Sequence, residues 1–313
     1  MKVLVAVYPF ITGKVNIEGF SFASDIWDHD PSANEIEEEL VRGQYDGLLI
    51  GTKTVNKSIV DKNKSLKMIS RLGVGLNNID VEFFKKHDVI TAYTPFGPTD
   101  STAEMTIAMI LAGTRRLTNY NAMMKENKWK REFGLRMMDA TVGIVGFGRI
   151  GKRVATLLKP FGCTILLNDI KPDKATAHAM GWHFVNKEEL LIKADIISFH
   201  VPLKEDTRDW LSFKEFVKLS RPVTIINTAR GGIVNEQAVY GYLKDHPQSY
   251  FCCDAFVEEP YKGPLSELEN CLLTPHASTF TVGSRKQTEL QAIDNCIKVL
   301  KGEPCDYIVE KNE

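Results

Sequence analysis

The stretch Thr141–Arg153, "TVGIVGFGRIGKR", decides the fold. An apolar, strand-like run leads directly into Gly146-x-Gly148-x-x-Gly151, and a helix-like run follows the glycines. A glycine triplet is a weak signal by itself, but a strand before it and a helix after it are typical of a dinucleotide-binding βαβ unit. There the first glycine permits a tight turn, the second lets the backbone approach a pyrophosphate, and the third lets helix and strand pack closely. The stretch predicts a Rossmann-type domain.

An acidic residue supports the same prediction. The next strand-like run, "TILLND", ends in Asp169, near the spacing from Gly146 that is expected for a ribose-binding acid. A carboxylate there accepts hydrogen bonds from both ribose hydroxyls and repels a 2′-phosphate, so we expect NAD rather than NADP. Arg149 lies near the expected phosphates and is either a phosphate contact or a solvated surface charge.

Strand-like and helix-like runs alternate along the whole chain. The runs "KVLVAVY", "YDGLLIG", "KMISRLG" and "DVITAYT" precede the glycine motif, and "CTILLND", "ADIISFHV", "PVTIINT", "SYFCCDAF" and "NCLLTP" follow it. Such alternation predicts parallel sheets covered by helices. Because 313 residues exceed what one core usually fills, we expect two α/β domains. These are a doubly wound, parallel-sheet Rossmann NAD domain over 98–282 and a smaller, flavodoxin-like substrate (catalytic) domain formed by 1–97 with 283–313.

The sequence predicts how two helices pack. Ser101-x-x-Glu104 reads as a capping box that opens a helix that is apolar nearly all round. That helix must be buried, either under a sheet or against a second subunit, and the pattern favours neither. The last helix, which places Leu290, Ile293, Ile297 and Leu300 on one face, is expected to pack back on the first domain.

Composition excludes several classes of protein. Lys plus Arg total 39 against 40 for Asp plus Glu, so no basic excess supports nucleic-acid binding. The apolar runs "MKVLVAV" and "MTIAMILAG" are too short for a signal-peptide core and a membrane span, respectively. Six cysteines without a CxxC pair argue against metal sites and disulfides, and reduced thiols fit a cytoplasmic location. Cys252 and Cys253 should point to opposite faces of a strand.

Three later segments end strand-like runs with chemically useful side chains. "INTARGGIVNE" presents Arg230, "DAFVEEP" presents Glu258 and Glu259, and "LLTPHAST" presents His276. Ligands of doubly wound sheets bind at the carboxyl ends of the strands, so these groups can converge. Hydride transfer to a 2-keto acid requires a cation that holds the carboxylate, an acid that protonates the alkoxide, and a partner for that acid.

Seven ordered blocks resemble the D-isomer-specific 2-hydroxyacid dehydrogenases: "SRLGVGLNNID", "TAEMTIAMILAGTRR", "VGIVGFGRIGKR", "ADIISFHVPL", "INTARGGIVNE", "CDAFVEEP" and "LLTPHAS". The resemblance covers nearly the whole chain. It implies an NAD-dependent, homodimeric oxidoreductase that interconverts a D-2-hydroxy acid and its 2-keto acid. It also implies that Arg230 binds the substrate carboxylate and carbonyl, that His276 is the general acid and base, and that Glu259 is the partner of His276.

The resemblance extends to binding residues. The backbone amides of Val74 and Gly75 would complete the carboxylate site, Asp254 would contact the nicotinamide amide, and Thr228 and Ala229 would lie near the nicotinamide ribose. The predicted cofactor contacts are Gly146, Gly148, Arg149, Ile150, Gly151, Asp169, His200, Val201, Pro202, Thr207, Thr228, Ala229 and Asp254; the predicted substrate contacts are Arg71, Val74 and Gly75.

The substrate cues conflict. Pro98 in "PFGPTDSTAE" favours the glyoxylate and hydroxypyruvate reductase branch. By contrast, an arginine before "LGVG", as at Arg71, resembles the pattern of the phosphoglycerate dehydrogenases, in which a cation at this position suits a phosphate. Tyr8 and Phe10 are either part of the substrate wall or loop packing. No regulatory domain follows residue 313, so serine control through such a domain is not expected. An NAD(H)-sensing interaction module, such as a corepressor on the same fold, is the alternative function.

Overall fold

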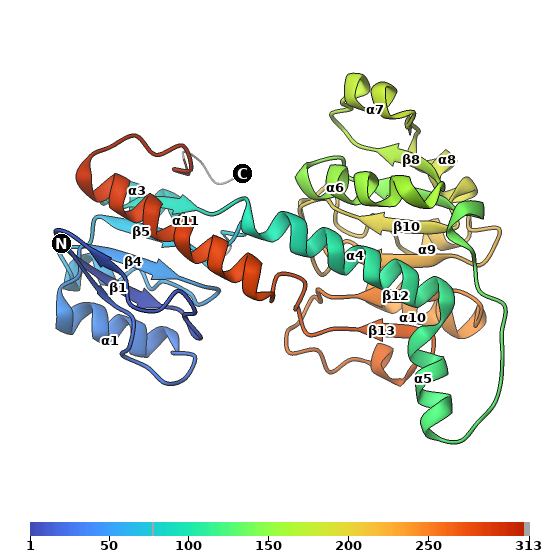
Figure 1. The fold of residues 1–313 in the computed structure, drawn as a ribbon, viewed down its shortest axis with the longest axis horizontal. Coiled ribbons are helices and arrows are strands. Elements are labelled where there is room, and N and C mark those ends of the chain that lie inside the picture. Colours follow the sequence, from blue (N-terminus) through green and yellow to red (C-terminus); the bar gives the residue numbers. More distant parts are fainter. Residues whose placement is uncertain (77, 310–313) are drawn as a thin grey trace. The chain divides into compact units, whose positions relative to one another are not determined.

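The computed structural model describes residues 1–76 and 78–309 (Figure 1). The chain divides into two compact units, the first formed by Met1–Pro98 with Thr279–Glu313 and the second by Thr99–Ser278. The sequence-based division placed the two crossings after residues 97 and 282, whereas the compact units meet after residues 98 and 278.

The first unit is built on a six-stranded sheet. Its strands follow the order β2-β3-β1-β4-β5-β6, and every neighbouring pair is parallel except β2 with β3. The strands are β1 (Lys2–Ala6), β2 (Asn16–Ile17), β3 (Phe20–Ala23), β4 (Gly47–Ile50), β5 (Met68–Arg71) and β6 (Ile90–Tyr93). Because β1, β3, β4, β5 and β6 run in one direction, the loops that follow them share one edge of the sheet.

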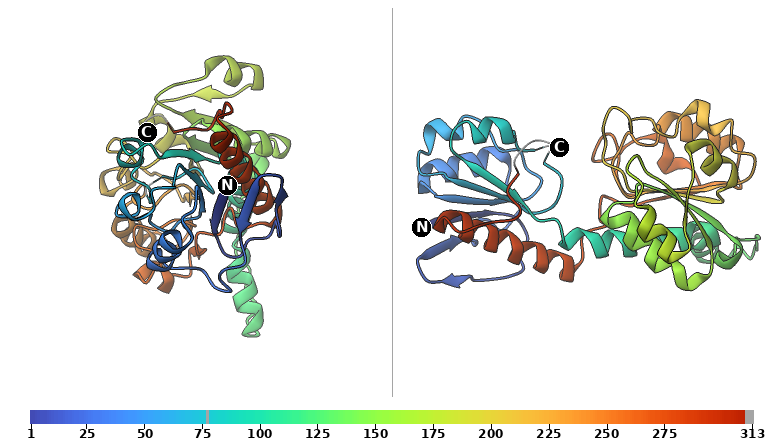
Figure 2. Two further views of the ribbon diagram at one scale, coloured as in Figure 1. Left: turned by 90° about the vertical axis from the view of Figure 1, so that its left-hand side faces the viewer. Right: turned by 90° about the horizontal axis from the view of Figure 1, so that it is seen from above.

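Helices cover both faces of this sheet (Figure 2, right). Alternate residues of β1 show the division, since Leu4 and Ala6 pack with α1, α2 and α3 while Val3 and Val5 pack with α11. These helices are α1 (Ala33–Gly43), α2 (Ile59–Lys62), α3 (Val81–Lys85) and α11 (Val282–Lys301). The last helix therefore does return to the first unit, as predicted.

The second unit is built on a seven-stranded parallel sheet of order β13-β12-β11-β10-β7-β8-β9. The order extends both ways from the adjacent β7 and β10, which is the doubly wound arrangement that the sequence predicted. The strands are β7 (Thr141–Val145), β8 (Thr164–Asn168), β9 (His183–Phe184), β10 (Ile196–Phe199), β11 (Thr224–Asn227), β12 (Tyr250–Cys253) and β13 (Cys271–Leu273).

Two layers of helices cover this second sheet. One core joins the sheet to α4, α6 and α7, and the other joins it to α8, α9 and α10. Cys252 lies in the first core and Cys253 in the second, which confirms that these neighbours face opposite ways. The helices are α4 (Gly97–Arg115), α5 (Leu117–Lys125), α6 (Arg149–Leu158), α7 (Lys174–Met180), α8 (Lys187–Lys193), α9 (Phe213–Phe216) and α10 (Glu236–Asp245), with single 3-10 turns at Met137–Asp139, Lys159–Phe161 and Pro264–Glu267.

Helix α4 differs from the sequence prediction at its start. It begins at Gly97, so Ser101 lies inside the helix and the expected capping box was wrong. Its apolar residues Ala103, Met109 and Ile110 are buried in the core of the second unit. Burial under a sheet, one of the two expected explanations, therefore accounts for these three.

Helix α11 also corrects the predicted buried face. Leu290 is half exposed, whereas the neighbouring Glu289 is fully buried. The carboxylate of Glu289 accepts hydrogen bonds from the backbone amides of Ile11 and Thr12 at 2.8–3.2 Å and from the Thr12 hydroxyl at 2.7 Å. It also pairs with Arg285 at 2.8 Å. A charge satisfied by so many donors tolerates burial that hydrophobicity alone would forbid.

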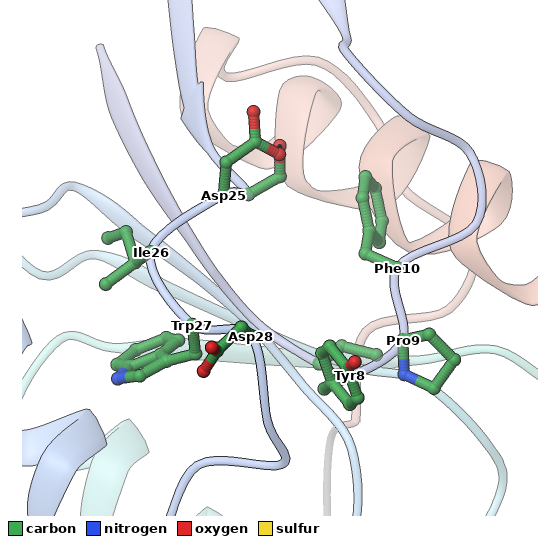
Figure 3. A pocket seen from close by; sticks show the side chains of 9 residues that line it. Tyr8, Pro9, Phe10, Asp25, Ile26, Trp27 and Asp28 are labelled. Atoms are coloured by element: carbon green, nitrogen blue, oxygen red, sulfur yellow. Dashed lines mark hydrogen bonds between the residues drawn. The ribbon is translucent and has the colours of Figure 1, made fainter.

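The same contacts fix the loop that follows β1. Arg285 donates to the carbonyl oxygen of Pro9 at 2.9 Å, next to the contacts that Glu289 makes with Ile11 and Thr12. Tyr8, Pro9 and Phe10 of this loop line one side of a cavity (Figure 3). Helix α11 thus holds the loop in place from outside that cavity.

Replacing Glu289 with alanine should destabilise the protein. The substitution leaves the Ile11 and Thr12 amides and Arg285 without their acceptor, and breaking a buried ion pair costs about 3 kcal/mol or more. Urea unfolding should show the loss, with Glu18→Ala, an exposed acid in the same unit, as the control. Equal stability of the two variants would contradict the proposed clamp.

Candidate active site

Five loops meet at the carboxyl edge of the second sheet. They follow β7, β10, β11, β12 and β13, which are all parallel. The predicted glycine motif, His200, Arg230, Glu259 and His276 lie on these five loops in that order. The sheet therefore brings together side chains that lie far apart in the sequence.

The glycine motif forms the turn between β7 and α6. Gly146 has φ +95°, and a Cβ at this position would collide with the backbone of His200. A Cβ on Gly151 would collide with the carbonyl oxygen of Gly146, so only glycine lets α6 start this close to β7. Gly148 is the N-cap of α6, and nothing lies within 4 Å of where its Cβ would be. The backbone is thus open to an incoming group at the N-terminus of the helix, where Arg149 and Ile150 form the first turn.

Asp169 stands beside this turn. One carboxylate oxygen accepts from the backbone amide of Phe147 at 2.6 Å, and the other accepts from that of Lys171 at 2.7 Å. These bonds fix the side chain against the glycine motif. Since each carboxylate oxygen accepts more than one hydrogen bond, capacity remains for two ribose hydroxyls.

The loop after β10 contains four of the predicted cofactor contacts: His200, Val201, Pro202 and Thr207. The ring of His200 contacts the Ser198 hydroxyl at 2.9 Å, and burial lowers the pKa of His200 to about 3. A histidine with so low a pKa stays neutral at physiological pH, which suits a structural role better than proton transfer. Thr207 donates to the carbonyl oxygen of Pro202 at 2.6 Å and accepts from the amide of Lys204 at 2.7 Å, which closes the loop.

The loop after β11 presents Arg230. Thr228 is buried, and its hydroxyl contacts that of Thr106 in α4 at 2.9 Å. The amide of Ala229 donates to Asn227 at 3.2 Å, and the Asn227 amide group donates to the carbonyl oxygen of Arg230 at 2.9 Å. Arg230 donates to the carbonyl oxygen of Ala229 at 2.7 Å. The loop is therefore fixed by its own residues around a partly buried guanidinium.

Electrostatics at Arg230 reflect two opposing effects. Burial lowers its pKa, and the nearby carboxylate of Glu259 acts in the opposite direction. An arginine remains charged despite such a shift, because its ordinary pKa lies far above neutrality. The site thus holds a permanent cation in a partly desolvated place.

His276 and Glu259 form an ion-pair contact. The Nδ1 of His276 lies 2.9 and 3.0 Å from the two carboxylate oxygens of Glu259. Glu259 also accepts a hydrogen bond from the amide of Phe256 at 3.0 Å, which orients its carboxylate. Both side chains remain partly exposed, at 44% for His276 and 38% for Glu259. The imidazole is therefore oriented by its partner while solvent and ligands still reach it.

Asp254 positions the loop that carries His276. This carboxylate is fully buried and accepts hydrogen bonds from the Thr274 hydroxyl and from the amides of Ala277 and Ser278, at 2.5, 2.8 and 2.9 Å. The resemblance assigned Asp254 to the nicotinamide amide, but its contacts in the structure are with the His276 loop. The position of Asp254 directly after β12 could be predicted from the sequence. Its hydrogen-bond partners could be identified only from the folded structure.

Gly231 is a second residue whose role the sequence did not reveal. A Cβ on Gly231 would collide with the backbone of Phe256 and Val257. Glycine at this position lets the Arg230 loop and the Glu259 loop approach each other.

In the first unit, the predicted substrate contacts are Arg71, the last residue of β5, and Val74 and Gly75 in the loop that follows. No described residue accepts a hydrogen bond from the backbone N–H of Val74 or Gly75. Gly73, at φ +129°, exchanges hydrogen bonds with Thr94: its amide donates to the Thr94 hydroxyl at 2.6 Å, and its carbonyl accepts from the Thr94 amide at 3.1 Å. The loop is thus anchored just before the two predicted amides.

Arg71 is buried rather than displayed. Its guanidinium donates to the carbonyl oxygen of Leu72 and, at 3.3 Å, to the side chain of Asn78. Asn78 in turn donates to the carbonyl oxygens of Gly51 and Lys53 at 3.1 and 2.7 Å. Arg71 therefore belongs to a network that ties the loop after β5 to the loop after β4.

Together, the glycine turn, the open N-terminus of α6 and the acid after β8 fit the pyrophosphate and ribose of a dinucleotide. No cluster of three or more metal-binding side chains is found among residues 1–76 and 78–309. Within the same residues, no helix has the length and apolar composition needed to cross a bilayer. The fold and this set of features are typical of a nucleotide-dependent oxidoreductase.

Comparisons with known proteins agree with this class. Residues 107–278 match the family model described as "D-isomer specific 2-hydroxyacid dehydrogenase, NAD binding domain". The chain belongs to the D-isomer specific 2-hydroxyacid dehydrogenase family, and its second unit is the NAD-binding domain.

Individual relatives differ in name and length. The chain is 32% identical to a D-3-phosphoglycerate dehydrogenase of Methanocaldococcus jannaschii over 96% of its own length and 58% of that protein, so it spans little more than half of this relative. It is 30% identical to a glyoxylate reductase of Korarchaeum cryptofilum over 94% of its own length and 93% of that protein. Among solved structures, TT0316 of Thermus thermophilus superposes with a TM-score of 0.84 at 27% identity, covering 99% of this chain and 100% of the other.

Replacing Asp169 with alanine should reduce the preference for NADH over NADPH roughly tenfold, because two ribose hydrogen bonds and the repulsion of a 2′-phosphate are lost together. Fluorescence titration with both cofactors measures the ratio of their dissociation constants. Asp173→Asn, a nearby acid that pairs with Lys152, is the control. A ratio that stays at the wild-type value would remove Asp169 from the ribose site.

Proposed function

We propose that the protein is an NAD-dependent dehydrogenase that interconverts a D-2-hydroxy acid and its 2-keto acid. The observation that carries the proposal is the His276–Glu259 contact beside the partly buried Arg230, at the edge where a dinucleotide turn also lies. The bound cofactor supplies or accepts the hydride. The remaining tasks, which are holding the acid and moving a proton, belong to the protein.

His276 is proposed to move the proton. Its Nδ1 is engaged by Glu259, so Nε2 is the nitrogen that donates to the carbonyl oxygen during reduction and accepts during oxidation. Glu259 holds the ring orientation and stabilises the imidazolium, which is the role of a carboxylate behind a catalytic histidine. Asp254 fixes the backbone of the loop that carries His276, which keeps His276 next to Glu259.

Arg230 is proposed to hold the substrate carboxylate and to polarise the carbonyl. A guanidinium presents several N–H donors in one plane, and within the described part of the chain that of Arg230 donates to the carbonyl oxygen of Ala229. The amides of Val74 and Gly75 are proposed to complete the carboxylate site. Partial desolvation of Arg230 strengthens its interaction with a bound carboxylate relative to water.

We further propose that the substrate is an unphosphorylated acid, as the glyoxylate reductase relatives suggest, rather than 3-phosphoglycerate. Arg71 was the residue that favoured a phosphate. Its guanidinium is buried and donates to Leu72 and Asn78, so we assign it to positioning the Val74–Gly75 loop. A phosphate dianion needs donors that are not already engaged.

The alternative function, an NAD(H)-sensing interaction module, has less support. The relatives compared above are named as enzymes, and the three groups that catalysis requires lie at one edge of the sheet. We also propose a reducing, cytoplasmic location, because all six cysteines, each within the described residues, are free thiols.

Replacing His276 with glutamine should lower kcat/KM by about 10²- to 10⁴-fold, because glutamine cannot transfer the proton. The assay is NADH oxidation with glyoxylate and hydroxypyruvate, and NAD reduction with 3-phosphoglycerate. NADH binding should be unaffected, since His276 is assigned to the proton alone.

The control is His178→Gln, an exposed histidine in the same unit. Wild-type protein that binds NADH but turns over neither these acids nor longer 2-keto acids would point to the sensing function. Full activity of the His276 variant would overturn the proton assignment.

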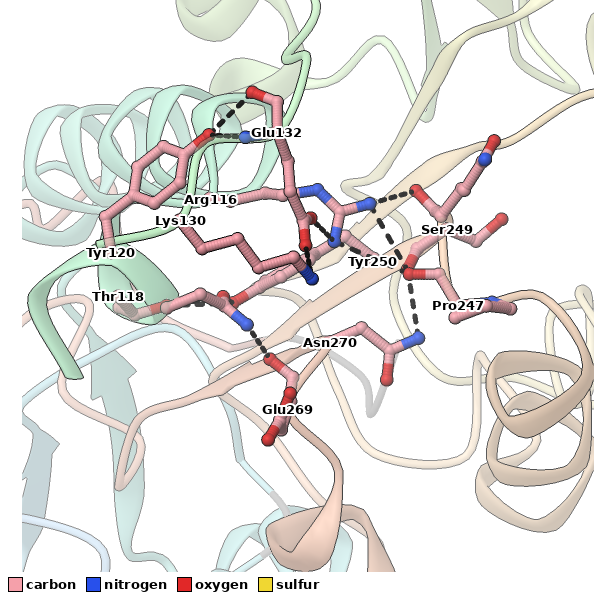
Figure 4. Close-up of polar contacts among 12 residues, drawn as sticks. Arg116, Thr118, Tyr120, Lys130, Glu132, Pro247, Ser249, Tyr250, Glu269 and Asn270 are labelled. Atoms are coloured by element: carbon pink, nitrogen blue, oxygen red, sulfur yellow. Dashed lines mark hydrogen bonds and ion pairs between the residues drawn. The ribbon is translucent and has the colours of Figure 1, made fainter. Parts of the chain in front are cut away.

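We propose that the protein forms a homodimer through the segment 117–138, here called the arm. The arm exposes large apolar side chains, among them Trp129 at 79% and Phe133 at 106%. It is nevertheless held in place, because Tyr120 exchanges hydrogen bonds of 2.6 and 3.0 Å with the backbone of Glu132, and Arg116 pairs with the Glu132 carboxylate (Figure 4). A fixed segment that exposes apolar residues is typical of a protein interface.

Replacing Trp129 and Phe133 with aspartate should convert a dimer into a monomer, because both apolar anchors would become charged. Light scattering on protein eluting from a sizing column measures the mass. Val217→Asp, an equally exposed apolar position of the same unit outside the arm, should leave the mass unchanged. A wild-type monomer, or a variant that remains dimeric, would contradict the proposal.

A further inference from the structure

A cavity of the first unit has no role in the proposed chemistry. It has a volume of about 610 Å³, within the usual range of small-molecule sites, and lies at the carboxyl ends of β1 and β3. One wall is the loop after β1, with Tyr8 and Phe10, and the other is the loop after β3, with Asp25, Trp27 and Asp28 (Figure 3).

The chemistry of the lining is specific. Three aromatic rings and two carboxylates surround the hollow, with Asp25 and Asp28 on opposite sides of it in Figure 3. None of the nine described residues that line it carries a basic side chain. Aromatic faces and carboxylates both attract cations, and carboxylates repel anions.

Each of the two carboxylates has a local hydrogen-bonding partner. Asp25 accepts a hydrogen bond from the Ser24 hydroxyl at 3.2 Å. Asp28 contacts His29 at 3.1 Å, and this hydrogen bond lowers the pKa of Asp28; the other ring nitrogen of His29 contacts Glu35 at 3.0 Å. His29 is therefore shared between two acids. Asp25 and Asp28 are both exposed to solvent, and they give the lining of the cavity a net negative charge.

The walls are fixed before any ligand binds. Glu289 and Arg285 of α11 hold the loop after β1 at Pro9, Ile11 and Thr12. Trp27 packs against one core of the sheet and Phe10 against the other. A preformed pocket spends less binding free energy on ordering its own side chains.

The cavity lies at the same edge of the first sheet as the Val74–Gly75 loop, which is proposed to bind the substrate carboxylate. The strands β1, β4 and β5 are consecutive and parallel, so the ends of β1 and β5 lie about 10 Å apart by the usual strand spacing. That separation suits a substrate whose carboxylate is held at Val74 and Gly75 and whose far end reaches the cavity.

We propose that this cavity, lined by Tyr8, Phe10, Trp27, Asp25 and Asp28, binds a guanidinium or ammonium group at the far end of the substrate. The inference rests on the proposed dehydrogenase function and narrows its substrate class to 2-keto and 2-hydroxy acids with a cationic tail. The carboxylates select the charge, and the aromatic faces select a flat or soft cation over a hydrated metal ion.

The test is steady-state NADH oxidation by the full chain with 2-keto-5-guanidinovalerate, 2-ketohexanoate and 2-ketoglutarate, which carry a cationic, a neutral and an anionic tail. Wild-type kcat/KM should fall in that order. In the Asp25→Asn, Asp28→Asn double variant, the ratio of the guanidino acid to the neutral acid should fall about tenfold. Asp30→Asn, in the same loop but paired with Lys53 at 2.7 Å, should keep the wild-type ratio.

The outcomes separate this proposal from the function on which it rests. Turnover of glyoxylate or 2-ketohexanoate without a preference for the cationic tail, or a preference that survives in the double variant, would overturn the cavity assignment alone. If no acid is reduced, the proposed function fails, and calorimetric titration with 4-guanidinobutanoate decides the cavity. Binding that the double variant loses would support a cation site, and no binding to the wild type would overturn it.

Discussion

The candidate site depends on one buried carboxylate. Asp254 has no contact with solvent, and three donors from the loop after β13 satisfy it. A buried charge is tolerated only when hydrogen bonds replace its hydration, so the loop must remain in the position where those donors reach Asp254. His276 lies between two of the donors, and its φ of +51° is an uncommon backbone conformation that the neighbouring bonds hold in place. The position of the histidine beside Glu259 follows from this constraint.

The parallel sheet supplies the second constraint. Each strand ends at the same edge, so a side chain placed just after a strand is brought near the others whatever its distance in the sequence. Gly231 then removes the last obstacle, because any side chain there would separate the Arg230 loop from the Glu259 loop. The proposed chemistry uses Arg230, Glu259 and His276, and the spacing of these residues depends in addition on Gly231 and Asp254.

Sequence reasoning predicted the architecture and most loop positions. The glycine motif, Asp169 and the strand-end residues follow local rules of spacing, and the structure has them at the expected edge. The burial of Glu289 was missed because its donors belong to Arg285, one turn before it in the same helix, and to Ile11 and Thr12, which lie near the other end of the sequence. The start of α4 at Gly97 and the contacts of Asp254 were missed for the same reason: long-range packing decided them, and a local pattern cannot show it.

Arg71 illustrates why a residue type does not determine a role. An arginine just before the Val74–Gly75 loop can bind a phosphate when its guanidinium faces the ligand. It stabilises the loop when the guanidinium faces the backbone. The structure has the second orientation, with Leu72 and Asn78 as acceptors, while the acids after β3 face a cavity at the same edge. The positive charge of Arg71 is thus satisfied within the protein, whereas Asp25 and Asp28 present negative charge at the surface. Under the proposed function, substrate selection at this edge depends on which charges the fold has already neutralised, and that is a property of the folded chain rather than of its composition.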